Sequence, residues 1–132
     1  RGPGMFGDLA AVCEEVGDSL SVCLQVNVSG EGSKRGVVPE ETASLVERCA
    51  GLRRVELVGL MTIPPFTPEA EGARPHFAAL RELRDACARQ TGVALPELSM
   101  GMSGDFEIAV EEGATLVRLG TALFGPRGNY GA

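Results

Sequence analysis

The chain has 132 residues, a formal net charge of −6, 44% hydrophobic residues and 23% charged residues, which is typical of one ordinary globular domain. The acidic balance argues against attachment to nucleic acid or to an anionic membrane surface, and no apolar run reaches the roughly 18 residues that a membrane span needs. The first residues, RGPGMFGDLAAV, show no signal-peptide pattern, so a cytoplasmic protein is expected.

The first half of the chain predicts a helix, a strand and a second helix. Residues 1–19 are an uncertain N-terminus with a candidate leading helix at 6–17. The run LSVCLQVNVS, 20–29, is nearly continuous in Val and Leu and predicts a strand buried on both faces. A Gly-rich loop separates it from a helix predicted over 39–52, where Pro39 suits the first turn. Four residues at helical spacing form the apolar stripe of this helix: Thr42, Leu45, Val46 and Cys49.

The second half repeats the pattern. A strand is predicted over 55–63, a breaker-rich loop over 64–75 and a helix over 76–92 that ends at Gly92. A short strand within 95–103, a helix over 104–113, a strand over 114–120 and a closing turn, TALFG, follow. The inward residues of the two helices are predicted to be Phe77, Leu80, Leu83 and Cys87 in the first, and Phe106, Ala109 and Val110 in the second.

The order β-α-β-α-β-α-β indicates an α/β fold with a parallel sheet flanked by helices. This sheet is either open and doubly wound or part of a (β/α)8 barrel, which needs eight strands and about 250 residues. No GxGxxG motif follows the first strand, so a dinucleotide-binding open sheet is not supported.

The cysteines and the single histidine give no metal signature. Cys13, Cys23, Cys49 and Cys87 are widely spaced, and we expect small buried thiols in a reducing cytosol. His76 has no second ligand at metal-binding spacing and is expected at the surface of a helix start.

Candidate ligand-binding residues lie where the last strands end. In both closures of the sheet, ligands bind at the carboxyl ends of the strands. The loops GMSGD and GTALFG place glycine and a hydroxyl residue there, which suits a phosphate group. Ser103, Gly120 and Thr121 are the candidates. The alternative is structural: Ser103 caps the 104–113 helix, and Gly120 and Thr121 begin a turn.

Two basic residues lie near these loops. Arg118 shares one strand face with Leu116, and a buried guanidinium needs a partner: either a ligand or a core carboxylate. Lys34 is the single lysine, and it is either a solvated loop residue or an amine that reacts with an aldehyde.

Three stretches together resemble the pyridoxal phosphate homeostasis protein family (YggS/PROSC family). They are LQVNVSGEGSKRGV, VGLMTIP and LSMGMSGDFEIAVEEGATLVRLGTALFGPR, and the resemblance covers residues from about 20 to 127. The family implies a single-domain barrel similar to the N-terminal domain of alanine racemase, and it implies binding of pyridoxal 5′-phosphate (PLP). Residues 1–132 would then be one partial barrel domain, the C-terminal half with four β/α units of a PLP-binding (β/α)8 TIM-type barrel.

The resemblance also implies roles for residues. Ser103, with Met102 beside it, Gly120 and Thr121 would hold the cofactor phosphate, and Arg118 would face the pyridine nitrogen. Lys34 matches a lysine in the family's corresponding loop and would be a secondary amine acceptor. No catalytic or metal-binding residue is implied.

The family's function is PLP carriage and regulation in vitamin B6 homeostasis, without established turnover. PLP-dependent apo-enzymes are candidate partners. The family's Schiff-base lysine lies on the first barrel strand, which has no match in this sequence, so the resemblance implies a missing N-terminal half-barrel. Two alternatives stay open: a PLP-dependent racemase-like or decarboxylase-like enzyme, and a barrel that binds a phosphorylated metabolite without PLP.

Overall fold

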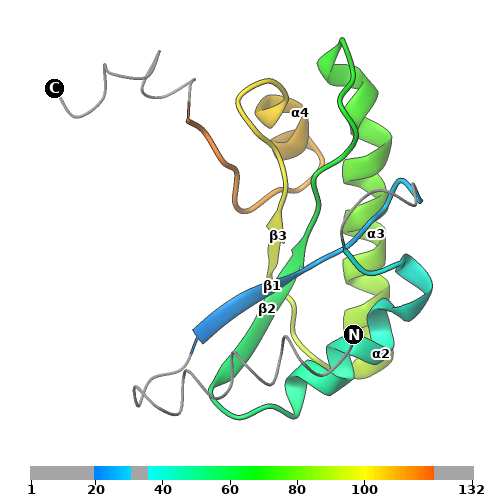
Figure 1. Cartoon of the computed structure of the whole chain (residues 1–132), viewed down its shortest axis with the longest axis vertical. Coiled ribbons are helices and arrows are strands. Elements are labelled where there is room, and N and C mark those ends of the chain that lie inside the picture. Colours follow the sequence, from blue (N-terminus) through cyan, green and yellow to red (C-terminus); the bar gives the residue numbers. More distant parts are fainter. Residues whose placement is uncertain (1–19, 31–35, 121–132) are drawn as a thin grey trace, which may run out of the picture.

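The computed structural model describes residues 20–30 and 36–120 (Figure 1). The predictions for a helix at 6–17 and for the closing turn TALFG lie outside these residues. Within them, parallel strands alternate with helices. The strands are β1 (Leu20–Gln25), β2 (Val55–Met61) and β3 (Glu97–Ser99), hydrogen-bonded in the order β1-β2-β3. The helices are α2 (Pro39–Ala50), the 3-10 helix η1 (Ala70–Ala73), α3 (Arg74–Thr91) and α4 (Phe106–Glu111).

The two longer helices begin and end close to where the sequence predicts. Pro39 is the first residue of α2. Proline has no backbone N–H, and none is needed there, because the first N–H groups of a helix have no partner within the helix. Two glutamates in the first turn interact favourably with the helix dipole. The α3 helix ends at Gly92, whose backbone φ of +78° is the left-handed conformation that glycine adopts readily. The parallel α/β arrangement is therefore confirmed in the described part of the chain.

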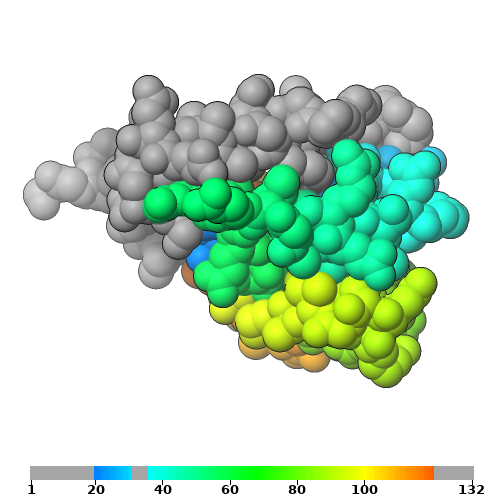
Figure 2. All heavy atoms as spheres, turned by 90° about the horizontal axis from the view of Figure 1, so that it is seen from below, coloured from blue at the N-terminus to red at the C-terminus, as the bar shows by residue number. Residues whose placement is uncertain are grey.

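The hydrophobic core lies between the helices and one face of the sheet. Leu24, Leu60 and Leu98 are paired across the three strands, so their side chains share that face, and all three are buried. Val46 of α2 and Phe77 of α3 belong to the same buried cluster. Seen from below, α2 and the later part of α3 lie against one another (Figure 2).

The opposite face of the sheet has no helix packed on it among the described residues. Its paired residues are Cys23, Gly59 and Glu97 in one row and Gln25, Met61 and Ser99 in the next. Except for Gly59, these residues are only partly buried. The expectation that the first strand is buried on both faces is therefore wrong, because the described helices cover one face only.

The last predicted strand, 114–120, does not form within the described residues. Leu116 makes an isolated bridge to Ser99, and the Met100 amide donates to the Leu116 carbonyl at 3.0 Å. The next bond runs from the Arg118 amide to Gly101, where φ is +107°. This turn of the backbone at Gly101 ends the regular ladder after one bridge.

Two smaller predictions also need correction. The loop predicted over 64–75 contains η1 and the first residues of α3. The helix predicted over 104–113 is shorter, Phe106–Glu111, and only Ala109 of its expected apolar face is buried, whereas Val110 is 56% exposed. In the earlier helices, Thr42, Val46, Cys49, Phe77, Leu80 and Cys87 are buried as predicted, and Leu45 and Leu83 are partly buried.

Candidate functional site

The segments that leave the sheet at the carboxyl ends of β1, β2 and β3 lie along one edge, because the three strands are parallel (Figure 1). They are residues 26–30, 62–69 and 100–105. A fourth segment, 116–118, runs beside the third and is joined to it by two backbone hydrogen bonds. This edge is where parallel α/β proteins bind ligands.

Two buried polar side chains lie at the ends of β1 and β2, and one of them, Thr62, joins the two ends. The Thr62 hydroxyl is 1% exposed and donates to the Val26 carbonyl at 2.8 Å. The Asn27 side-chain oxygen accepts from the Ser29 hydroxyl at 3.0 Å and from the Gly30 amide at 3.1 Å. Because buried polar groups are costly without partners, the Thr62 bond holds the two strand ends together, and the Asn27 bonds fix the turn that follows β1.

The loop from Gly101 to Asp105 is tightly folded. A Cβ on Gly101 would stand 2.7 Å from the Cβ of Ala109, so glycine is needed for the loop to lie against α4. The Asp105 carboxylate accepts from the Met102 amide at 2.8 Å, and the Asp105 amide donates to the Met102 carbonyl at 3.1 Å. Ser103 lies between these two residues and is partly buried.

Ser103 does not cap the following helix. Asp105 occupies the N-cap position of α4, and no side chain makes a capping hydrogen bond there. The structural alternative for Ser103, an N-cap role, is therefore wrong. Met102 is 46% exposed, and its amide is already occupied by Asp105.

Arg118 lies beside this loop on the uncovered side of the sheet. Its amide donates to the Gly101 carbonyl at 2.9 Å. Leu116 pairs with Ser99 of the uncovered face, Arg118 follows two residues later, and its side chain is exposed. No carboxylate in the described part of the chain forms an ion pair with its guanidinium, so the alternative of a paired core arginine finds no support there.

The predicted site residues are thus only partly accounted for. The backbone brings Gly101, the Met102–Ser103 pair and Arg118 together. Gly120 is exposed, and a Cβ on it would meet no atom within 4 Å. Lys34 and Thr121 lie outside the described residues, so their roles stay predictions.

Asn27 and Thr62 were not among the predicted site residues, although both lie at strand ends. The signal was present in LQVNVSG and LMTIP, where one polar residue follows an apolar strand. Their hydrogen bonds to Ser29, Gly30 and Val26 identify them as structural supports of the segments that follow β1 and β2.

The thiols of the three described cysteines have raised pKa values. Burial raises the pKa of Cys23, and the negative charge of Glu97, in the same row of the sheet, raises it further. Burial also raises the pKa values of Cys49 and Cys87, which are both buried as predicted. Cys23 is only partly buried, because it lies on the uncovered face, and Cys13 lies outside the described residues. A thiol with a raised pKa is a poor nucleophile, so none of these three suits covalent catalysis.

The described residues contain neither a metal site nor a membrane span. No group of His, Cys, Asp and Glu side chains among them is arranged to hold a metal ion. No helix in the described segments has the length and apolar character that crossing a bilayer requires.

Sequence comparison assigns the family. The profile of the family described as "Alanine racemase, N-terminal domain" matches residues 5–128. The chain belongs to this family. The pyridoxal phosphate homeostasis protein of Aquifex aeolicus is 57% identical over 106 residues, which are 80% of this chain and 46% of that protein. The chain spans less than half the length of this protein and of the homologous proteins of Pseudomonas aeruginosa and Vibrio cholerae.

Solved structures agree with this assignment. PipY of Synechococcus elongatus, with PLP bound, is 34% identical with a TM-score of 0.83, and the match covers 95% of this chain and 58% of PipY. Alanine racemase from Corynebacterium glutamicum matches 81% of this chain and 30% of its own at a TM-score of 0.62 and 22% identity, which shows a shared fold. The described residues are thus a partial α/β domain of the alanine racemase-like barrel type.

Proposed function

We propose that this chain is part of a PLP-binding protein of intracellular vitamin B6 homeostasis, acting in the cytoplasm without catalytic turnover of its own. One observation carries the proposal: 57% identity to a pyridoxal phosphate homeostasis protein over 80% of the chain. The PLP bound to PipY, which shares the fold at 34% identity, supports the choice of cofactor.

The described residues fit such a cofactor. Arg118 supplies a cation that pairs with no described carboxylate, on a sheet face that no described helix covers. The adjoining loop is built from small residues, with Gly101 and Gly104 on either side of Met102 and Ser103. A phosphate ester and a pyridine ring need a cation, hydroxyl groups and closely approaching backbone, which this edge offers.

In this proposal, Ser103, Gly120 and Thr121 hold the phosphate, with Met102 beside them. Arg118 faces the pyridine nitrogen, where its charge disfavours protonation of that nitrogen. Bound PLP supplies an aldehyde and an aromatic ring that accepts electrons, and an unprotonated ring accepts them less strongly. Such a site suits holding and delivering the cofactor, with PLP-dependent apo-enzymes as recipients. Lys34 serves as a secondary amine acceptor.

We further propose that the chain corresponds to the last four β/α units of a (β/α)8 barrel, within one partial barrel domain spanning 1–132. One-sided helical cover supports this, because the uncovered sheet face of a half-barrel would be the barrel interior. The first half, with its strand-borne lysine, would then complete the interior and the cofactor site.

The test is a calorimetric titration of the full protein with PLP, using variants of this chain. We expect binding by the wild type, at least about fivefold weaker binding by Arg118→Ala because a charge-assisted contact is lost, and no change in Arg89→Ala. Arg89 is the matched control, an exposed arginine near the end of α3, away from the strand ends. No PLP binding by the wild type, or equal affinity in both variants, would contradict the proposal. An amino-acid racemisation assay should give no turnover.

A further inference from the structure

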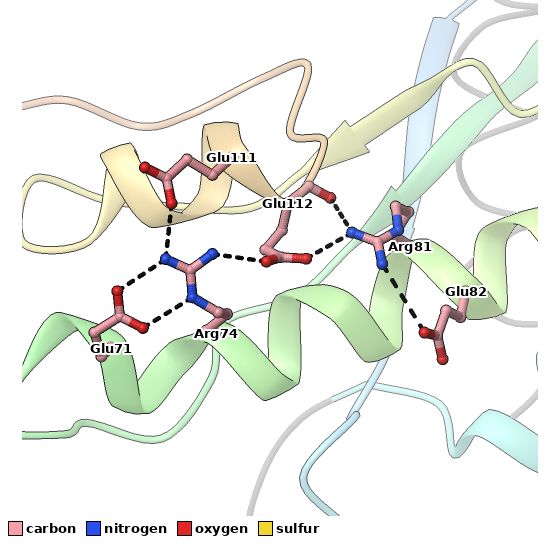
Figure 3. Close-up of polar contacts among 6 residues, drawn as sticks. All are labelled: Glu71, Arg74, Arg81, Glu82, Glu111 and Glu112. Atoms are coloured by element: carbon pink, nitrogen blue, oxygen red, sulfur yellow. Dashed lines mark hydrogen bonds and ion pairs between the residues drawn. The ribbon is translucent and has the colours of Figure 1, made fainter.

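A network of ion pairs joins α3 to the end of α4 (Figure 3). Arg74 and Arg81 lie about two helical turns apart on α3, so they share one side of that helix. The Glu112 carboxylate, directly after α4, accepts from Arg74 at 2.7 Å and from Arg81 at 2.6 Å. Arg81 also donates to the Glu112 backbone carbonyl at 3.0 Å. Glu112 is therefore held by both its side chain and its main chain.

The surroundings strengthen these contacts. Arg74 also donates to both carboxylate oxygens of Glu71 at 2.8 Å and to Glu111 at 2.7 Å. The Glu112 side chain is 16% exposed, whereas those of Glu71 and Glu111 are 64% and 60% exposed. Solvent screens an exposed ion pair more strongly, so Glu112 is the central carboxylate of the network.

The α4 helix places few side chains in the core, where Ala109 is buried and Ile108 is partly buried. It has six residues, too few for a helix that is stable by itself, and only Ala109 among them is buried. Val110 is 56% exposed and Glu107 is also exposed. The contacts of Arg74 and Arg81 with the end of α4 thus supply much of its attachment to α3.

The α4 helix also contacts the loop of the candidate site. Gly101 lies directly against Ala109, and the Asp105 carbonyl, at the start of α4, accepts from the Ala109 amide at 3.1 Å. The Gly101 carbonyl accepts the Arg118 amide at 2.9 Å. A shift of α4 would therefore move both the Gly101–Asp105 loop and the backbone of Arg118.

We infer that Glu112 is a positioning residue: clamped by Arg74 and Arg81, it sets the Gly101–Asp105 loop and the Arg118 backbone for the phosphate group of the ligand. This inference rests on the proposed function for its ligand, while the mechanical link rests on the contacts above. The Glu112 carboxylate bonds to the two arginines of α3, so its influence on the loop passes through α4.

Hydrogen exchange tests the link without any ligand. In Glu112→Gln, exchange at the Met102 and Arg118 amides should become about tenfold faster, since a charge-assisted contact is lost, while the Thr62 amide in the neighbouring segment should not change. Glu82→Gln is the matched control, because Glu82 is 75% exposed and lies 3.9 Å from Arg81 without reaching α4. Equal exchange in wild type and Glu112→Gln would overturn the inference. If that variant does not fold, Arg81→Lys is expected to give a smaller effect at the same two amides.

Ligand binding tests the consequence. Glu112→Gln should bind PLP several-fold more weakly than wild type and bind pyridoxal, which lacks the phosphate, equally well. Equal losses for both ligands, or none for either, would overturn the phosphate-positioning role. Failure of the wild type to bind PLP would instead overturn the proposed function, and the exchange result would still decide the link through α4.

Discussion

Gly59 shows how one residue sets the registry of the sheet. It pairs with Cys23 and Glu97, and a Cβ on it would stand 2.0 Å from the Glu97 carbonyl oxygen. Beside it the pairing of β1 and β2 shifts, which is a β-bulge. The bulge lets Leu57 and Leu60 both point to the covered face, where they are buried.

Gly59→Ala should destabilise the protein, because the added carbon would overlap the backbone of β3. We expect a loss of about 2–3 kcal/mol in the free energy of unfolding, measured by urea denaturation. Gly51→Ala is the control: its φ is −87° and its Cβ would be 3.6 Å from the nearest atom, so that variant should be nearly neutral. Similar losses in both variants would show that the close approach at Gly59 does not limit stability.

At the scale of elements, ion pairs contribute to the attachment of α4 to α3. Hydrogen bonds hold the pKa of Glu112 below its usual range, and the bond from Arg74 has a larger effect than the bond from Arg81. Hydrogen bonds from Arg74 likewise lower the pKa of Glu71. A carboxyl whose pKa is lowered on folding stabilises the fold above its unfolded pKa, and this contribution is lost as the pH falls through the folded pKa.

The urea midpoint of unfolding should therefore fall as the pH drops from 6 to 3, beginning near the unfolded glutamate pKa of about 4.3. In Glu112→Gln the fall should be smaller, because the titrating partner of the two arginines is gone. The control is Glu107→Gln, an exposed glutamate of the same helix with no ion pair among the described residues. A pH profile for Glu112→Gln that matches wild type would contradict this account.

The whole described structure has two unlike sheet faces, one against helices and one without them. Two neighbouring residues of β2 lie on opposite faces of the sheet: Leu60 is fully buried, whereas Met61 is partly exposed. Burial on one face makes stability depend on that face and leaves the other for Arg118 and its neighbours.

Substitutions at these two positions of this chain should differ in cost. Leu60→Ala should lower the free energy of unfolding by about 2–5 kcal/mol, as a cavity forms in the core. Met61→Ala should cost about 1 kcal/mol or less, because less surface is buried there. Thermal and urea unfolding of the two variants measure the contrast, and equal costs would mean that the second face is also packed.

The spacing of residues in the sequence was enough to predict the elements whose stabilising contacts are local. The helical spacing of Thr42, Val46 and Cys49, and the glycine stop at 92, correctly predict α2 and α3, and the alternation of elements correctly predicts a parallel sheet. The prediction fails at 114–120, where a positive φ at Gly101 on the neighbouring segment ends the pairing. The motifs around Ser103 and Arg118 also pointed to the candidate site, although Asn27 and Thr62 were missed.

By itself, the sequence determined the apolar stripes of the helices, the family and the candidate site residues, because periodicity and motifs are properties of residues close together in the chain. Tertiary structure alone decided that the described helices cover a single face, that Asp105 rather than Ser103 precedes α4, and that Arg81 reaches Glu112. These depend on contacts between residues far apart in the chain, whose energies are set by geometry after folding and leave no periodic trace in the sequence.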